Sequence, residues 1–577
     1  MHNSFQGWSK LNLNSVACPL DCYDTCEAVY EDGKCKPNKK HPTTGSKLCV
    51  NFGHLLNETV LEQPFFNNES LELDRALSML VEKLKSSEAQ NVLYYKGSGN
   101  LGVMQSAPKA FFASYGATLT RGSLCDGGGG EGLEQGRGKV VNPPIENLLN
   151  ADVIICWGRN FSVTSSHMYE LVKDKTFITI DPIKTDMAKK SALHLQINPK
   201  TDDELALLLT RFAYMNDLED EASFQEYASG ADWFFDLAKS RPVVSYEATT
   251  GVTLKEVTTF MEMIQNKKVA IMVGLGVQKY YEGATIMRCI DSFAAYIGVH
   301  NKEAGGLWYL SDSMYGYEKQ FLATPKKRVD IPSVNFADYE VVFIQGANPV
   351  ISAPNTKRVI EGLKKSFVVY FGTTFNETCE YANLIIPSTM FLEKEDVRIS
   401  YGHEYKAVSN KVREKTTQSI TEYELAQYLC NAFNLPALKE EQSVLEYYRN
   451  TTPERSHILE SFEFVEEADI VHLYEEKEEH EYYLITAKTK KCLNSQFKTD
   501  DNVYMNSSCG INEGAEVTIS SSYGQASFIL KHSDDVKENC VLIYAGAKNV
   551  NHLTSHKSDE ASFSAMYQEV LVTVELS

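Results

Sequence analysis

The sequence predicts a multidomain α/β protein that ends in a β-rich domain. The 577 residues exceed what one hydrophobic core usually supports, and 43% hydrophobic residues can supply several interiors. Short apolar runs rich in β-branched and aromatic residues alternate with helical stretches, which is typical of parallel sheets covered by helices. After about residue 480, turn residues separate alternating strands such as residues 517–519, and this pattern suggests a barrel.

Four cysteines near the amino end have a spacing that suits an iron–sulfur cluster. Cys18, Cys22 and Cys26 lie in one short segment, and Cys49 follows a turn that can fold back on them. Cys35 is the competing fourth ligand. A structural zinc site would usually show two CxxC-type pairs, and buried free thiols are the other alternative. An odd thirteen cysteines without a secretory leader make a disulfide framework a poor interpretation.

Five of the apolar runs end in small or polar residues. In open parallel sheets, ligands bind beyond the carboxyl ends of the strands, so these ends together predict the lining of a large cofactor site. Ordinary turn chemistry explains any single one of them. The runs, each with the residues that follow it, are 91–95 before 97–100, 152–156 before 157–160, 177–180 before 181–182, 341–344 before 345–349, and 367–370 before 372–374.

Two further segments bear on the cofactor. Residues 269–274 form an apolar run that predicts a buried strand. Residues 274–278 (GLGVQ) match only the first half of G-x-G-x-x-G, so a nicotinamide site is weakly supported.

Cys125 lies on a glycine-rich turn, residues 124–130 (LCDGGGG), and predicts a second metal site. Glycine lets a bulky cofactor approach the backbone, and a lone thiol there is more typical of a metal ligand than of a fifth cluster cysteine. A small buried hydrophobic residue is the alternative, because that is the usual role of a free cysteine. Asp126 is the next candidate ligand.

Charge and hydropathy exclude several classes of protein. The net charge of -21 argues against nucleic acid or an anionic membrane surface as a partner. No apolar run approaches the roughly 20 residues that span a bilayer. Residues 1–5 show neither a basic-then-apolar signal nor a twin arginine, so a cytoplasmic location is expected unless a leader has been removed.

Residues 18–26 (CPLDCYDTC), 41–45 (HPTTG) and 48–49 (LC) resemble the amino-terminal cluster domain of the bis-molybdopterin-guanine-dinucleotide oxidoreductases, the dimethyl sulfoxide reductase superfamily. The resemblance covers nearly the whole chain. It implies a small iron–sulfur domain, two doubly wound α/β nucleotide-binding domains and a carboxy-terminal double-psi β-barrel. The implied cofactors are a [4Fe-4S] cluster and molybdenum or tungsten bound to two molybdopterin guanine dinucleotides.

The resemblance also assigns site residues by position. The implied metal ligands are Cys18, Cys22, Cys26 and Cys49 for the cluster and Cys125 for molybdenum or tungsten. The implied cofactor contacts are Gly158, Arg159, Asn160, Asp181, Asp202, Gly274, Gln278, Asn348, Thr486 and Asn551. Taken alone, Asp181 and Asp202 are explained equally well as helix caps or surface charges.

Composition and resemblance together divide the chain into domains. The glutamate-rich residues 474–480 indicate a solvated linker. The expected segments are 1–60 for the [4Fe-4S] domain, 61–145 plus 338–440 for a discontinuous α/β domain, 146–337 for an α/β nucleotide-binding domain, 441–480 for the acidic linker, and 481–577 for the double-psi barrel.

Two departures from the family pattern affect the functional prediction. Members with this cluster often carry Lys or Arg two residues past the last cysteine, where this chain has Asn51, and Lys47 is the nearest substitute. Formate dehydrogenases of the family place a histidine directly after the metal-bound residue, where this chain has Asp126, and this weakens a formate assignment. His167 and His403 lie in family-like stretches and are equally well explained as packed or surface histidines.

The resulting prediction is a molybdenum or tungsten enzyme that performs two-electron or oxygen-atom transfer on a small substrate. Electrons would pass singly through the cluster to a separate electron-transfer protein or subunit. The alternative is a non-catalytic electron-transfer or scaffold subunit of a respiratory complex. Such subunits carry additional amino-terminal cluster domains, whereas 17 residues precede the first cysteine here.

Overall fold

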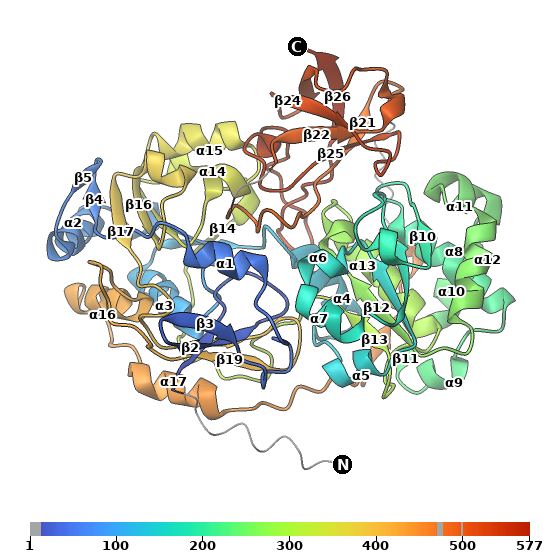
Figure 1. The fold of residues 1–577 in the computed structure, drawn as a ribbon, viewed down its shortest axis with the longest axis horizontal. Coiled ribbons are helices and arrows are strands. Elements are labelled where there is room, and N and C mark those ends of the chain that lie inside the picture. The colour runs from blue at the N-terminus through green and yellow to red at the C-terminus, as the bar shows by residue number, and fades with distance from the viewer. Residues whose placement is uncertain (1–12, 470–476, 498–499) are drawn as a thin grey trace.

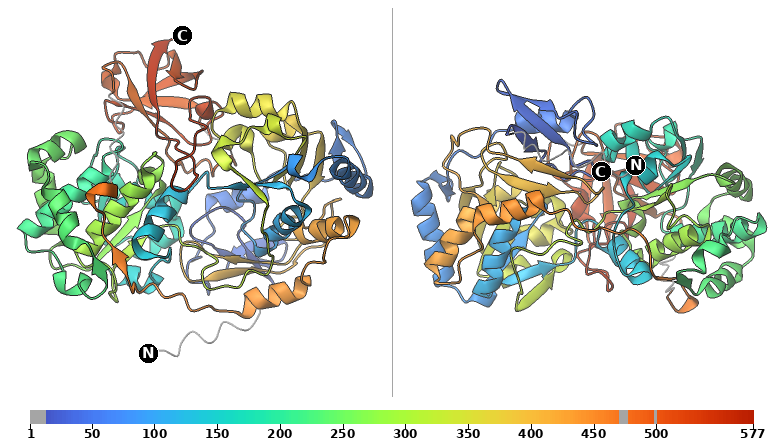
Figure 2. Two further views of the ribbon diagram at one scale, coloured as in Figure 1. Left: turned by 180° about the vertical axis from the view of Figure 1, so that it is seen from behind. Right: turned by 90° about the horizontal axis from the view of Figure 1, so that it is seen from below.

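The computed structural model describes residues 13–469, 477–497 and 500–577. Two parallel sheets lie side by side, the amino-terminal domain packs in front of them, and the carboxy-terminal barrel lies above both (Figure 1). Figure 2 shows the same arrangement from behind and from below, with the amino-terminal domain on one face of the molecule. The segment 1–5 and residues 474–476 of the acidic run fall outside the described residues.

The larger sheet has strand order β14-β7-β6-β15-β16-β17-β4-β5. All its pairs are parallel except those that add β4 and β5 at one edge. The strands are β14 (Lys327–Asp330), β7 (Thr118–Arg121), β6 (Val92–Lys96), β15 (Val341–Gln345), β16 (Phe367–Gly372), β17 (Leu384–Pro387), β4 (Phe65–Phe66) and β5 (Glu69–Ser70).

Helices cover both faces of this sheet, because its central strands are apolar on both sides. One face packs against α2 (Leu73–Lys85), α3 (Ser106–Tyr115), α16 (Glu422–Ala432) and α17 (Glu441–Asn450). The other face packs against α14 (Pro349–Ser352) and α15 (Thr356–Leu363).

The smaller sheet is parallel, with order β10-β9-β8-β12-β13. Its strands are β10 (Leu193–Leu195), β9 (Thr176–Ile180), β8 (Val153–Trp157), β12 (Val269–Val273) and β13 (Gly306–Trp308). One face packs mainly against α4 (Gly127–Arg137), α8 (Asp202–Met215), α10 (Ala231–Lys239), α11 (Val243–Thr250), α12 (Leu254–Ile264) and α13 (Gly283–Tyr296). The other face packs against α5 (Ile145–Leu149), α6 (Phe161–Thr164) and α7 (Ser166–Val172).

The amino-terminal domain is built on a small antiparallel sheet of β1 (Ser15–Ala17), β2 (Glu27–Glu31) and β3 (Lys34–Pro37), followed by α1 (Val50–Leu56). A hairpin of β18 (Asp396–Ile399) and β19 (Lys406–Ser409), nearly 400 residues further along the chain, packs against it. The hairpin therefore brings side chains from the larger α/β domain to the cysteine-bearing loop between β1 and β2.

The carboxy-terminal domain is a closed barrel that mixes parallel and antiparallel pairs. Its strands, in barrel order, are β21 (Tyr482–Ile485), β25 (Cys540–Ile543), β22 (Asn502–Met505), β24 (Gly524–His532), β23 (Glu516–Ser521) and β26 (Leu571–Leu576). Together with the two helix-covered sheets, this barrel confirms the predicted fold class.

The structure differs from the sequence-based segment boundaries in two places. β14 pairs with β7, so residues 327–330 belong to the larger sheet and not to the segment expected to end at 337. The expected solvated linker also begins with a packed helix, α17, whose Val444, Leu445 and Tyr448 are buried in the core. The glutamates of this helix lie on its outer face. Because the segment is rich in glutamate, its apolar stripe was not recognised from the sequence.

Candidate functional site

A cavity of about 1770 Å³ lies where the two sheets, the amino-terminal loop and the barrel meet. This volume exceeds the roughly 300–1,000 Å³ of a site for a drug-sized ligand. The residues that follow β6, β8, β9, β15 and β16 all line it, namely Gly97, Gly158, Asp181, Gly346 and Thr373. The five strand ends singled out in the sequence therefore meet at one cavity.

Nearly all residues selected from the sequence line this cavity. They are Cys18, Cys22, Cys26, Cys49, Cys125, Gly158, Arg159, Asn160, Asp181, Asp202, Gly274, Asn348, Thr486 and Asn551. Gln278 differs, because it is buried behind the wall and contacts the Cys125 turn. Of the two histidines, His167 lines the cavity, whereas His403 is buried beside the Asp24 carbonyl.

The four amino-terminal cysteines come together at the edge of the cavity. Burial raises the pKa of Cys26 well above its usual value, and Asp24, Cys18, Cys22 and Cys49 raise it further. Each of the three other thiols is therefore close enough to Cys26 to affect the pKa of its thiol.

Cys35 belongs to a different place. It lies on β3 opposite Tyr30, and it is not among the residues that line the cavity. Among the described residues, no three His, Cys, Asp or Glu side chains are close enough to hold a single metal ion. The thiols of Cys18, Cys22, Cys26 and Cys49 nevertheless all line the same cavity.

The Cys125 turn joins β7 to α4 and is held by two hydrogen bonds and a close contact with Tyr309. The Ser123 hydroxyl accepts the backbone N–H of Cys125 at 2.8 Å, and the Tyr309 hydroxyl donates to the Asp126 carbonyl at 3.1 Å. A Cβ atom on Gly129 would lie 2.4 Å from the Tyr309 ring, so glycine is required for this close approach. The turn is therefore fixed in the cavity wall with the Cys125 thiol half-buried.

The surroundings of Cys125 decide how readily its thiol loses a proton. Burial raises the pKa of Cys125 to about 12, Asp126 and Asp21 raise it, and Lys488 and Lys279 lower it. Lys279 donates to the Leu124 carbonyl at 3.1 Å. A bound metal ion would supply the positive charge that a thiolate needs at this position.

Buried polar groups line the side of the cavity formed by the smaller sheet. Arg159 donates to the Val273 carbonyl and to Ser165, at 3.2 and 2.8 Å, while its Nε has no partner among the described residues. Burial raises the pKa of Asp181 to about 7, against one backbone hydrogen bond that lowers it. Burial raises the pKa of Asp202 to about 7 as well, although it accepts a hydrogen bond from the Trp157 indole at 2.7 Å.

Glycines shape the wall between these groups. A Cβ atom on Gly274 would lie 2.0 Å from the carbonyl oxygen of Gly158, and Gly158 itself has a positive φ of 58°. The two backbones can therefore touch only because both residues are glycine.

Asparagines occupy the corresponding positions near the larger sheet and the barrel. Asn348 follows β15, accepts from the Thr378 hydroxyl at 2.8 Å and donates to Glu377 at 2.8 Å. Asn551, from the barrel, donates to the Ile351 carbonyl at 2.6 Å. These side chains connect the barrel to the sheet at the cavity rim.

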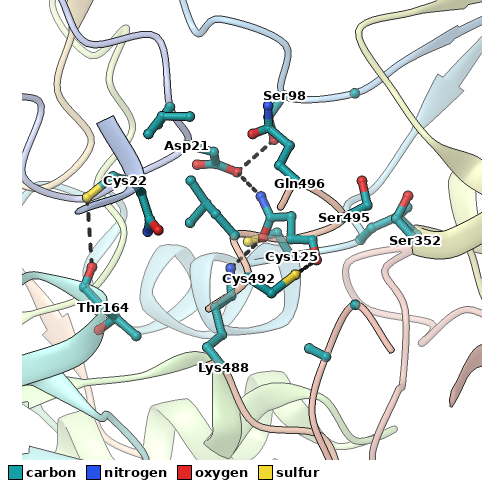
Figure 3. A pocket seen from close by; sticks show the side chains of 18 of the residues that line it. Asp21, Cys22, Ser98, Cys125, Thr164, Ser352, Lys488, Cys492, Ser495 and Gln496 are labelled. Carbon is teal, nitrogen blue, oxygen red and sulfur yellow. Dashed lines mark hydrogen bonds between the residues drawn. The ribbon is translucent and has the colours of Figure 1, made fainter. Parts of the chain in front are cut away.

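The structure adds a group of residues that sequence reasoning missed. Asp21 accepts hydrogen bonds from Ser98 at 2.8 Å, Tyr401 at 2.9 Å and Asn494 at 3.0 Å. Figure 3 shows Asp21, Cys125 and Lys488 among the side chains of this pocket. Burial would raise the pKa of Asp21, but Lys488 and the Ser98 and Tyr401 hydrogen bonds outweigh it and lower that pKa. No local sequence pattern indicates this group, because its members come from four distant segments.

The cavity fits a large polar cofactor. Its walls combine glycine-lined backbone, the buried carboxyl groups of Asp181 and Asp202, and the Nε atoms of Arg159 and Arg398, which have no partner within the part of the chain that the structure describes. Buried polar atoms normally have partners, so these atoms indicate a ligand that would supply them. Among the described residues, no helix is long and apolar enough to cross a membrane.

Comparisons with known proteins agree with this geometry. The chain is 26% identical over 442 residues to the probable oxidoreductase YyaE of Bacillus subtilis, covering 70% of this chain and 66% of that protein. It is 24% identical over 489 residues to the probable oxidoreductase YoaE of the same organism, covering 77% and 72%. Among solved structures, acetylene hydratase from Pelobacter acetylenicus matches with a TM-score of 0.81 over 98% of this chain and all of that chain, at 15% identity, and therefore shares the fold.

Two family models match in sequence. Residues 73–432 match the molybdopterin oxidoreductase model, and residues 477–571 match the molybdopterin dinucleotide binding domain. The first match alone spans more than half of the 577 residues. The chain therefore belongs to the molybdopterin oxidoreductase family, within the dimethyl sulfoxide reductase superfamily that its cysteine motifs resemble.

Proposed function

We propose that this protein is a molybdenum or tungsten oxidoreductase that carries out two-electron or oxygen-atom transfer on a small substrate. The observation that carries the proposal is the single cavity in which Cys125, the four-cysteine group and the strand ends of both sheets meet. When bound, the metal held by pterin dithiolenes supplies the redox chemistry, and the protein supplies binding, orientation and electronic tuning.

The pterin dinucleotides would be held at both sheets and under the barrel. On the side of the smaller sheet, the proposed contacts are Gly158, Arg159, Asn160, Asp181, Asp202 and Gly274. On the other side, they are Asn348, Asn551 and Thr486. A guanine base offers N–H donors, and Asp181 and Asp202 are buried carboxyl groups that such donors would satisfy. We assign Gln278 a supporting role, because it contacts the Cys125 turn from behind.

Cys125 is the proposed protein ligand of the metal. Its thiol lies on a turn fixed by Ser123 and Tyr309, and Lys279 and Lys488 lower its pKa against burial. Asp21 lies in the same pocket, where three hydrogen bonds hold its carboxylate in one orientation. Such an oriented acceptor could hold the proton of a substrate hydroxyl or a water molecule near the reacting atoms.

Cys18, Cys22, Cys26 and Cys49 are the proposed ligands of a [4Fe-4S] cluster that relays single electrons. Val50 and Leu56 of α1, directly after Cys49, expose 61% and 44% of their surfaces. An electron-transfer protein or subunit that docks on this side of the amino-terminal domain would therefore approach the cluster closely.

Metal analysis of anaerobically purified protein tests the proposal. The expected result is molybdenum or tungsten, extractable pterin and about four irons per chain. Iron without molybdenum, tungsten or pterin would instead favour a non-catalytic electron-transfer subunit.

A further inference from the structure

A single buried arginine binds the backbone of the cysteine loop. Arg398 lies on β18 and is only 2% exposed. Its guanidinium donates to the carbonyl oxygens of Cys18 at 2.5 Å, Leu20 at 2.6 Å and Cys22 at 2.6 Å. One side chain, some 380 residues away in sequence, thus fixes three of five consecutive carbonyl groups.

Within the described residues, Arg398 forms no ion pair and its Nε has no partner. Three carbonyl dipoles contact its guanidinium directly, and the Asp21 carboxylate of the same loop is near enough for Arg398 to lower its pKa. A buried cation keeps a strong field at short range, because buried surroundings screen it weakly. The groups nearest to that field are the loop and its thiols.

The loop that Arg398 binds carries two of the four cysteines themselves. The Arg398 guanidinium contacts the carbonyl oxygens of Cys18 and Cys22, so its charge lies beside the residues that bear both thiols.

We propose that Arg398 is a positioning residue for the iron–sulfur cluster, which holds the Cys18–Cys22 loop in its cluster-binding conformation and raises the cluster's reduction potential. This inference rests on the proposed [4Fe-4S] cluster. Reduction adds negative charge to the cluster, so a nearby cation stabilises the reduced form. Arg398 would thereby supply the buried positive charge that the chain lacks at Asn51, two residues past Cys49.

Arg398→Lys and Arg398→Met test this role, with Arg358→Met as the matched control. Lysine keeps the positive charge but lacks the planar guanidinium that donates to three carbonyl groups. Methionine removes both the charge and the hydrogen-bond donors. Arg358 likewise donates to two backbone carbonyls, of Ser333 and Val334, but does so on α15 away from the cysteines. The measurements are iron per chain, the electron paramagnetic resonance spectrum of the reduced protein, its midpoint potential and thermal unfolding.

The expected result is a midpoint potential lowered slightly in Arg398→Lys and more strongly in Arg398→Met, with loss of iron in the latter and no change in Arg358→Met. Wild-type iron content and potential in Arg398→Met would overturn the inference and leave the proposed function standing. If Arg398→Met does not fold, Arg398→Lys decides, because a spectrum and potential identical to wild type would overturn the inference as well. Wild-type protein that binds no cluster would refute the cluster itself, and with it this role of Arg398.

Discussion

Gln278 donates a hydrogen bond from its Nε2 to the backbone carbonyl of Cys125 at 2.7 Å, across 153 positions in the sequence. Its Oε1 accepts the backbone N–H of Gly129 at 3.1 Å. One buried amide therefore ties both sides of the glycine-rich turn to the short helix η4 (Leu275–Gln278), which follows the end of β12. Gln278 therefore helps to hold the turn that carries the Cys125 thiol.

Replacing Gln278 with leucine should destabilise the protein by about 1–3 kcal/mol, because it leaves a buried carbonyl and a buried N–H without partners. Urea unfolding measures this loss, and turnover should fall with it because the turn loses its orientation. Gln135→Leu, on the exposed side of α4, is the matched control and should change stability little. Equal stabilities of the two variants would contradict the supporting role of Gln278.

Asp291 on α13 should make stability depend on pH in the acid range. Burial raises the pKa of Asp291, but the Arg137 and His300 charges and hydrogen bonds outweigh it and lower that pKa to about 2. A carboxyl group with a depressed pKa stabilises the fold above its unfolded pKa, and this contribution disappears as the pH falls from about 4 to about 2. The shift corresponds to about 2 kcal/mol.

In the wild type, the Arg137 guanidinium contacts Oδ1 of Asp291 at 2.5 Å. Asp291→Asn removes the ionisable group and leaves Arg137 buried without an anionic partner. We expect a loss of about 3–5 kcal/mol at neutral pH. The difference in melting temperature between mutant and wild type should narrow as the pH is lowered toward 3. A difference that stays constant over that range would show that Asp291 does not titrate in this window.

The two candidate fourth ligands of the cluster are separable by substitution. Cys49→Ser should lose or distort the cluster, because Cys49 lines the cavity and influences Cys26. Cys35→Ser should keep about four irons per chain, since Cys35 lies on β3 and does not line the cavity. Iron analysis and electron paramagnetic resonance give the readout. The reverse pattern would identify Cys35 as the ligand.

The local sequence was sufficient to predict where the strands end, but not to predict the contacts that hold the loops. Buried runs of β-branched residues that stop at glycine or polar residues predict parallel strands, so Gly158, Asp181 and Gly346 could be assigned to the lining of one cofactor site. Arg398 and Tyr401 reach the cysteine loop from nearly 400 residues away, on a hairpin whose own sequence shows no sign of its target. Only the tertiary fold determines such pairs.

Electron delivery should require a separate protein. Residues 274–278 lack a complete dinucleotide fingerprint, and the exposed side chains of Val50 and Leu56 beside the proposed cluster suit contact with a protein partner. Turnover assays with NADH or NADPH and no mediator should therefore show little activity, while an artificial one-electron donor or acceptor should restore it. Efficient mediator-free turnover with either nicotinamide would refute this.

Cys125→Ser should separate the metal's coordination from the fold. The proposed cluster ligands and pterin contacts are other residues of the cavity, so iron, pterin and the melting temperature should stay close to wild type. Serine offers a harder oxygen donor in place of a soft thiolate, so turnover should fall by orders of magnitude. X-ray absorption should show one more sulfur at the wild-type metal than the dithiolenes supply, and the substitution should remove it. Cys509→Ser, a half-buried thiol of the barrel, is the control. If the Cys125→Ser spectrum and activity match those of this control, Cys125 is not a ligand, and Asp126 becomes the next residue to replace.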